Sequence, residues 1–330
     1  MVYPQLGSDK IVVEQALYTS GEGWDYRITA ASRGIIDSEK MDIEKESLIK
    51  YYFSPDVIFV DAIKTFKLST GRYAISYVTA SSRDEYNRPA RFRAHILVSD
   101  PRLIDFLVDP RVFKPFFLRK DVFEKIDSLK LNAYDFLIDS ISRIFNVRRL
   151  LKDVMNLFND EMLEFIFSAL FMLKRVFIVP SDLISVETIE KKTSITSMDV
   201  ISSILYLLPA TLRKNISTGS LVFHGELEKV NIGFLHPSGV LPETSAVVID
   251  LEEQAIHLVG ERKRKLKNEL ATSYTKLVTS SLLDNDFYTI ETLTDILNSS
   301  LSISRKLGKL GLKFLQKVID NIPENYYVRR

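Results

Sequence analysis

The spacing of apolar residues changes near residue 101, and this change limits what the chain can fold into. Before that point, the segment RPARFRAHILVSD at 88–100 alternates polar and apolar side chains. Successive side chains of a strand point to opposite faces. One face therefore holds Arg91, Arg93 and His95, and the other holds the apolar side chains between them. This period of two predicts a strand with one buried face.

The same type of pattern recurs through the rest of the N-terminal region. Four further strands are predicted, at 10–19, 24–34, 62–68 and 72–80. The last two are joined by Ser-Thr-Gly, a short hairpin connection in which Gly71 supplies a positive φ. Between the two pairs, residues 38–53 begin with Ser38 and a run of charged residues, which predicts a helix that crosses the sheet.

After residue 100 the apolar residues recur at spacings of three and four, which predicts amphipathic helices. The expected helices are at 101–109, 119–130, 132–145, 147–158 and 160–176. They are interpreted as a packed bundle. The segment Pro-Ser-Asp at 180–182 then interrupts the pattern, and a further helix over 194–209 is stopped by Pro209.

A second β region follows, with glycines and prolines between its apolar segments. Its four predicted strands are at 217–225, 230–237, 245–253 and 255–260, and helices follow from about 261. The predicted class is therefore α+β. It comprises an antiparallel N-terminal sheet domain with a crossing helix (1–105), a helical middle bundle (106–180) and a smaller C-terminal α/β portion (181–330) ending in helices.

Composition excludes several kinds of site and environment. The chain of 330 residues has no cysteine, which rules out disulfides, thiolate metal ligands and cysteine nucleophiles. The formal net charge of +1 gives no overall attraction to nucleic acid. The longest apolar run, at 162–173, is shorter than the roughly 20 residues of a membrane-spanning helix. Because the N-terminus has no signal-peptide pattern, a cytoplasmic protein is expected. The few glutamines and many charged residues are typical of heat-adapted proteins.

No catalytic motif is present in the sequence. It contains no phosphate-binding GxxxxGK[ST] loop, no GxGxxG turn, no HExxH helix and no GxSxG elbow. Three of the four histidines lie in the second β region, and these could share a metal with nearby carboxylates. That set is His224, His236 and His257 with Glu226, Asp250 or Glu252. Local hydrogen bonding is the favoured role for these histidines, so no metal and no cofactor are predicted.

Two other segments carry alternative interpretations. The basic run RKRKLK at 262–267 could contact phosphates of nucleic acid or lipid, but acidic residues lie close to it in the sequence. A solvated helix face is therefore favoured, and nucleic-acid binding is not expected. The amphipathic segment at 305–322 could lie on a membrane, but closing the core is the commoner use of such a stripe.

The face of the strand at 88–100 that carries Arg93 and His95 is the most informative local feature. Basic groups in a row repel one another unless acidic side chains or an anion lie opposite. One interpretation is a solvated face paired with Asp25, Asp84 or Glu85. The other is a face that binds an anion or a protein partner.

The residues of these strands resemble a known family, the first type of GTPase-associated protein. Its N-terminal domain has a strand ending in Tyr-Thr, a glycine-bearing loop, a strand ending in Ala-Ala-Ser-x-Gly and, later, Phe-x-Ala-His-x-Leu-Val-x-Asp. The matching residues are Tyr18, Thr19, Ala30, Ala31, Ser32, Gly34, Arg88, Phe92, Ala94, His95, Leu97, Val98 and Asp100. Pro209, Arg213 and Ser217 are similar to a Leu-Pro-x-x-x-Arg-x-x-Leu-Ser turn of its middle region. Pro89 and Ala90 depart from the family, which has a glycine after the arginine.

The resemblance implies a non-catalytic regulatory or adaptor protein that docks on a small GTPase or another component of a prokaryotic GTPase-linked signalling system. Trp24, the only tryptophan, lies in a glycine-flanked polar loop, where it either folds back on the sheet or contacts a partner. Trp, Tyr and Arg contribute most to interface energies. The expected partner-binding residues are Tyr18, Trp24, Tyr26, Arg27, Arg88, Arg93 and His95. The alternative is a hydrolase that uses His95 or the histidines of the second β region.

Overall fold

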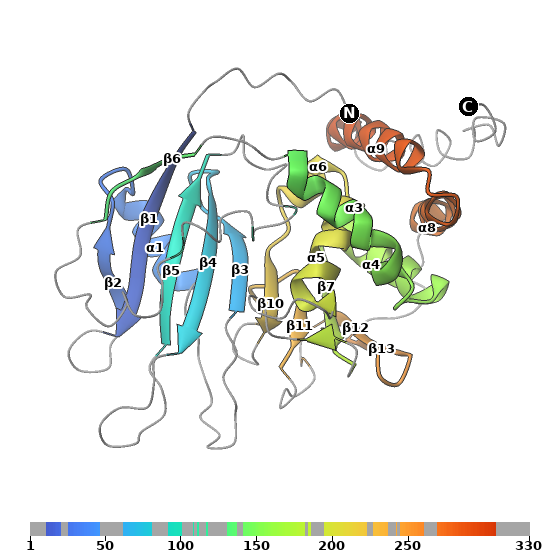
Figure 1. The fold of residues 1–330 in the computed structure, drawn as a ribbon, viewed down its shortest axis with the longest axis horizontal. Helices are drawn as coiled ribbons and strands as arrows, with labels where there is room; N and C mark the ends of the chain where they lie inside the picture. The colour runs from blue at the N-terminus through green and yellow to red at the C-terminus, as the bar shows by residue number, and fades with distance from the viewer. Residues whose placement is uncertain are drawn as a thin grey trace.

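The computed structural model describes about three fifths of the chain (Figure 1). The described residues are 11–20, 26–46, 62–80, 92–100, 108, 111, 117, 131–136, 141–181, 184–185, 195–222, 227–236, 242, 245–260 and 269–307. They form helices and one large mixed sheet, which confirms the mixed α+β class. Among their helices, none is both long enough and apolar enough to cross a membrane.

The N-terminal part of the large sheet is antiparallel throughout. It consists of β1 (Ile11–Ser20), β2 (Tyr26–Ala31), β3 (Ala62–Lys67), β4 (Tyr73–Ala80) and β5 (Phe92–Ser99), in the order β3-β4-β5-β1-β2. All five strands were predicted from period-two patterns. The β3–β4 connection contains Gly71 at φ 86°, a conformation that glycine adopts without the steric cost of a Cβ atom.

The C-terminal part of the sheet is mostly parallel. Its strands are β7 (Arg175–Val179), β10 (Thr218–Val222), β11 (Ile232–Leu235), β12 (Ala246–Asp250) and β13 (Ala255–Val259), in the order β13-β12-β7-β11-β10. Only β13 is antiparallel to its neighbour within this part. A separate two-stranded sheet pairs β8 (Ile184–Ser185) with β9 (Ile195–Thr196).

The two parts join where β3 pairs with β10 in antiparallel fashion. The ladder there is short, and buried hydroxyl groups reinforce it. The Thr65 and Thr218 hydroxyls lie 2.8 Å apart, and the Ile63 amide donates to Ser220 Oγ at 2.8 Å. One hydrogen-bonded sheet therefore extends across residues that the sequence pattern assigns to the first and third domains.

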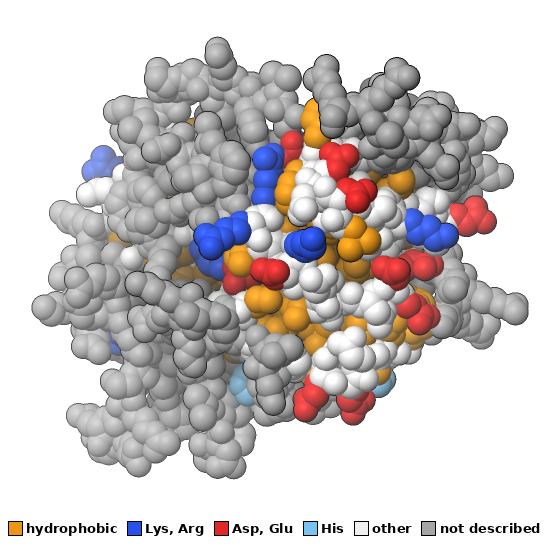
Figure 2. Space-filling view, turned by 45° about the vertical axis from the view of Figure 1, so that its right-hand side comes forward, with side chains coloured by type: hydrophobic (Ala, Val, Ile, Leu, Met, Phe, Trp, Pro, Cys, Tyr) orange, Lys and Arg blue, Asp and Glu red, His pale blue; other side chains and the backbone are white. Residues whose placement is uncertain are grey.

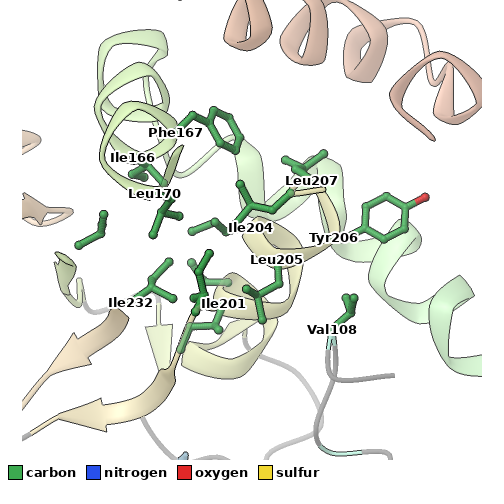
Figure 3. Close-up of a cluster of buried hydrophobic side chains, with 14 of the residues drawn as sticks. Val108, Ile166, Phe167, Leu170, Ile201, Ile204, Leu205, Tyr206, Leu207 and Ile232 are labelled. Carbon is green, nitrogen blue, oxygen red and sulfur yellow. The ribbon is translucent and has the colours of Figure 1, made fainter. Parts of the chain in front are cut away.

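Six helices of the described residues lie on the side of the C-terminal part of the sheet (Figure 1). They are α3 (Ile141–Met155), α4 (Asp160–Phe171), α5 (Ser197–Tyr206), α6 (Ala210–Arg213), α8 (Glu269–Leu283) and α9 (Phe287–Leu307). Of these, α4 contacts β7 and β12, and α5 contacts β10 and β11. Asn159 caps α4, and Thr196 with Asp199 forms a capping box at the start of α5. Figure 3 shows Ile166, Ile201 and Ile204 converging between these helices and the strands, within the largest buried apolar cluster of the described residues.

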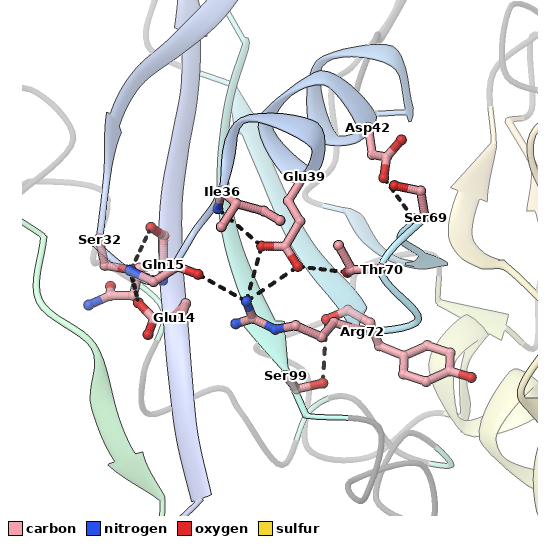
Figure 4. A network of polar contacts seen from close by, with 12 residues as sticks. Glu14, Gln15, Ser32, Ile36, Glu39, Asp42, Ser69, Thr70, Arg72 and Ser99 are labelled. Carbon is pink, nitrogen blue, oxygen red and sulfur yellow. Dashed lines mark hydrogen bonds and ion pairs between the residues drawn. The ribbon is translucent and has the colours of Figure 1, made fainter.

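One face of the antiparallel part is covered by α1 (Asp37–Glu46). Ile43 of α1 is buried against a small apolar cluster on β1, β3, β4 and β5. Polar contacts hold the helix to the β3–β4 turn (Figure 4). Glu39, which is 1% exposed, accepts from Thr70 Oγ1 at 2.7 Å and from Arg72 at 3.0 Å. The predicted helix over 38–53 is confirmed as far as Glu46.

Three predicted helices were wrong in part, because strand pairing overrides the local pattern. In the helix expected over 194–209, Ile195–Thr196 form β9 and the helix α5 begins at Ser197. Residues Tyr134–Phe136, expected in a helix over 132–145, form β6, which pairs with β1. Residues Arg175–Val179, whose start was expected at the end of a helix, form β7 between β12 and β11. A short apolar run such as RVFIV fits a buried strand or a buried helix equally well by spacing alone. Residues Ile141–Met155 form a single helix, α3, across the predicted break near 146.

Some predicted elements lie outside the described residues. These are most of the helices at 101–109 and 119–130, the basic run at 262–267 and the segment after 307.

Replacing a fully buried aromatic ring should strongly destabilise the chain. Phe167 has no exposed surface and makes an edge-to-face contact with Tyr274 at 5.2 Å. We expect Phe167→Ala to lower the free energy of unfolding by about 3–5 kcal/mol, from lost apolar burial and the cavity left behind. Tyr288→Ala, at a side chain that is 74% exposed, should stay within about 0.5 kcal/mol of the parent. Urea denaturation measures both, and equal effects would contradict the packing described.

The buried ion pair between Glu39 and Arg72 gives a second stability test. Glu39→Ala leaves Arg72 and the Thr70 hydroxyl without their carboxylate partner. We expect a loss of about 3 kcal/mol, at the low end for breaking a buried pair because Arg72 is partly exposed. In the same helix, Lys40 pairs with Asp37 at the surface, so Lys40→Ala should cost less than about 1 kcal/mol. The two variants are compared by urea denaturation, and a smaller loss for Glu39→Ala than for Lys40→Ala would exclude the pair as the anchor of α1.

Candidate functional site

A row of polar side chains crosses the end of the antiparallel part of the sheet. Thr19 of β1 stands opposite Arg27 of β2 on one side and Arg93 of β5 on the other. Arg93 in turn stands opposite Thr79 of β4. Residues directly opposite one another in antiparallel strands project from the same face. These four residues are called the arginine row.

The exposure of the four side chains differs along the row. Arg27 at the edge strand is exposed and Arg93 is half-buried, whereas Thr19 and Thr79 are buried. Strands lie 4.7–4.9 Å apart, so the two arginine backbones are separated by about 10 Å across β1. Two unit charges at that distance repel by about 0.4 kcal/mol in water. The cost of placing the two arginines in one row is therefore small.

A β-bulge places Arg27 in this row. The register of β1 with β2 shifts between Leu17 and Tyr18. Without the shift, continuing the pairing of Leu17 with Ala30 would set Thr19 opposite Ile28. One extra residue in β2 therefore turns Arg27 to the face of Thr19 and turns Ile28 to the other face, where it packs near α1. Bulges commonly re-aim side chains in this way near functional sites.

His95 lies next to the arginine row on the same face, and the structure buries it completely. Its Nε2 atom is 2.9 Å from Gln15 Oε1, and Phe117 contacts the imidazole edge-on with ring centroids 5.8 Å apart. The Gln15 amide nitrogen donates to the Asn132 carbonyl, which leaves Oε1 as an acceptor facing His95. His95 must then donate from Nε2.

Burial lowers the pKa of His95 to about 3, because the charged imidazolium is disfavoured away from water. The side chain is therefore neutral at physiological pH and has no accessible surface. It does not contribute a charge to the expected contact face. A general base needs a pKa near the working pH, and Nε2 of His95 lies against an amide oxygen rather than a nucleophile.

Tyr18 and Tyr26 lie on the opposite face of the sheet from the arginine row. Tyr18 is 2% exposed and stacks on Tyr26 with ring centroids 5.8 Å apart. Burial, together with the nearby Glu44 carboxylate, raises the pKa of Tyr18 to about 12. Alternation along β1 and the register with β2 put both rings on the α1 side. The expected contact residues therefore do not form one surface.

Of the seven expected partner-binding residues, the structure places Arg27 and Arg93 in one row and stacks Tyr18 on Tyr26 on the opposite face. Trp24 and Arg88 lie outside the described residues, as do the acidic residues Asp25, Asp84 and Glu85.

The sequence interpretation missed four residues of this region. Thr19 and Thr79 complete the arginine row, and Gln15 and Phe117 cover His95. The burial of Gln15 could have been predicted from the sequence, because Gln15 shares the strand face of the apolar Leu17. A buried amide needs a hydrogen-bond partner. The contact of Phe117 with His95 could not have been predicted from local patterns, because Phe117 is distant in sequence from the strand that carries His95.

The histidines of the second β region are only partly brought together. His236 follows β11 and is 8% exposed, whereas His224 and Glu226 lie outside the described residues. His257 of β13 lies near Asp250 and Glu253, with one ligand atom from each within 4.8 Å of the others. The structure thus brings together Asp250 and His257, two of the residues expected for a metal site. The third member of the group is Glu253 and not the expected Glu252.

Comparison with known proteins adds no family to these observations: no protein-family model and no curated protein matches this chain. The resemblance to GTPase-associated proteins therefore stays a prediction from the residues themselves.

The low pKa of His95 predicts a specific pH dependence of stability. The unfolded state binds a proton near pH 6.5 and the folded state near pH 3, so protonation favours unfolding between these values. We expect stability to fall as pH drops from about 6.5 towards 3, with His95 contributing up to about 1.4 kcal/mol per pH unit. His95→Gln should lose this contribution in urea titrations across pH 4–7. An unchanged pH slope in that variant would contradict the buried neutral state.

Proposed function

We propose that this chain is a non-catalytic regulatory or adaptor protein that docks on a small GTPase or another component of a prokaryotic GTPase-linked system. The observation that carries the proposal is the arginine row, with Arg27 and Arg93 on one face at the end of the sheet. Arginine is the side chain best suited to bidentate pairing with carboxylates and phosphates. Trp24 lies in the chain between the two strands that carry Thr19 and Arg27.

The mechanism of such a protein is differential binding. The arginine row would bind an acidic surface that the partner presents better in one nucleotide state than in the other. The difference in binding free energy between the two states then shifts the partner's equilibrium towards the state that is bound more tightly. Thr19 lies between the two arginines and Thr79 lies on the other side of Arg93, and both are short and buried, so the arginines are the two long side chains of the row. The shift is limited to the difference in affinity between the two states.

A hydrolase remains the alternative function, and the two sets of histidines differ in how well they support it. His95 is disfavoured as a base by its burial and its lowered pKa. His257 is half-buried and lies beside two carboxylates, so a histidine-dependent reaction would use this group rather than His95.

The first test is capture of partners from the native extract in the presence of GDP or of a non-hydrolysable GTP analogue. We expect a small GTPase to be retained in one nucleotide state and identified by mass spectrometry. Recovery of neither a GTPase nor another component of a GTPase-linked system, in either nucleotide state, would overturn the proposal.

The second step assigns the surface with purified partner. Loss of a central interface arginine typically costs about 2 kcal/mol or more, which is roughly 30-fold in affinity. We expect Arg93→Ala and Arg27→Ala each to weaken binding at least tenfold, and Trp24→Ala to weaken it as well. Arg149→Ala removes the same charge from an exposed position on α3 and should bind like the parent. Equal binding by all four variants would exclude the arginine row as the contact.

A further inference from the structure

We infer that the β12–β13 hairpin binds a divalent transition-metal ion of the Zn²⁺ class through Asp250, Glu253 and His257. The three side chains each offer one ligand atom, and all three atoms lie within 4.8 Å of one another. The inference is independent of the proposed adaptor function. It concerns the opposite end of the sheet from the arginine row.

The strand register explains why the aspartate and the histidine converge. Asp250 stands opposite Ala255, and His257 stands opposite Val248. Asp250 and His257 are therefore diagonal neighbours on one face of an antiparallel pair, where Cβ atoms are about 7–8 Å apart or somewhat less. An aspartate oxygen and an imidazole nitrogen can both reach a metal ion over that separation. Glu253 comes from the turn between the strands and supplies the third ligand.

Backbone contacts hold the aspartate in place. Asp250 Oδ1 accepts hydrogen bonds from the amides of Glu252 and Glu253, at 3.0 and 2.9 Å. The second carboxylate oxygen, Oδ2, remains available as a ligand. Hydrogen bonds that orient a ligand in this way are a regular part of protein metal sites. The turn is also held by Gln254, whose side-chain nitrogen donates to the Leu251 carbonyl at 3.0 Å.

The donor set selects the class of ion. One imidazole nitrogen with two carboxylate oxygens suits Zn²⁺ and its neighbours, whereas Ca²⁺ and Mg²⁺ prefer oxygen alone. Three protein ligands leave one position of a tetrahedral ion open. His257 is half-buried and Glu253 is exposed, and Figure 2 shows acidic side chains at the surface of the described residues. The open position can therefore take a water molecule or a donor group from another molecule.

The test is metal binding by the tag-free full-length chain after treatment with a chelator. Calorimetric titration with Zn²⁺ and visible absorption with Co²⁺ should each show one equivalent bound. His257→Ala should abolish the Co²⁺ bands that report nitrogen and oxygen coordination. Glu253→Gln should weaken binding by more than the 10–100-fold typical for loss of an outer-sphere partner.

The matched control is Glu252→Gln, at the neighbouring residue of the same turn, which is exposed and does not belong to the group. It should bind both ions like the parent. Circular dichroism confirms that each variant is folded, and Glu253→Gln changes only an exposed turn side chain. The inference is overturned if the parent binds neither ion, if His257→Ala keeps the same affinity, or if Glu252→Gln and Glu253→Gln lose equal amounts.

Discussion

The short antiparallel pairing of β3 with β10 joins the two parts of the sheet, and the packing of the other elements depends on it. Beside this joint, the close approach of β10 and β11 requires glycine. A Cβ atom on Gly233 would lie 2.7 Å from the Gly219 carbonyl oxygen, and one on Gly219 would lie 2.8 Å from a Val222 methyl group. The hydroxyls of Thr65 and Thr218 meet at the joint. Because the face is continuous across it, one apolar cluster packs against both antiparallel and parallel strands.

Both proposed binding sites lie towards the outer strands of this sheet. β2 and β13 end the strand order, and an outer strand has one neighbour instead of two. At β2, the Ile28 amide donates to Glu44 of α1, which occupies a backbone donor that another strand could otherwise pair with. The arginine row and the metal ligands instead use side chains, so recognition at either end does not require adding a strand.

Neighbouring side chains on one strand face have different environments, so one can contact a partner while the next has a structural role. Arg93 and His95 project from the same face of β5, yet Arg93 is half-buried and His95 is enclosed by Gln15 and Phe117. A side chain with no exposed surface can orient its neighbours but cannot bind a partner directly. A charged group one row nearer the end of the sheet keeps access to solvent.

Local patterns in the sequence determined the strands β1 to β5, the glycine turn between β3 and β4, and the shared face of Arg93 and His95, because all three depend on alternation and turn chemistry within a few residues. Tertiary structure decided the strand identity of Arg175–Val179, the burial of His95 and the meeting of Asp250, Glu253 and His257. The bulge that turns Arg27 towards Thr19 also belongs to this second set. The physical reason is that pairing register, burial and ligand convergence depend on which distant segments lie alongside, and hydrophobic periodicity carries no information about that choice.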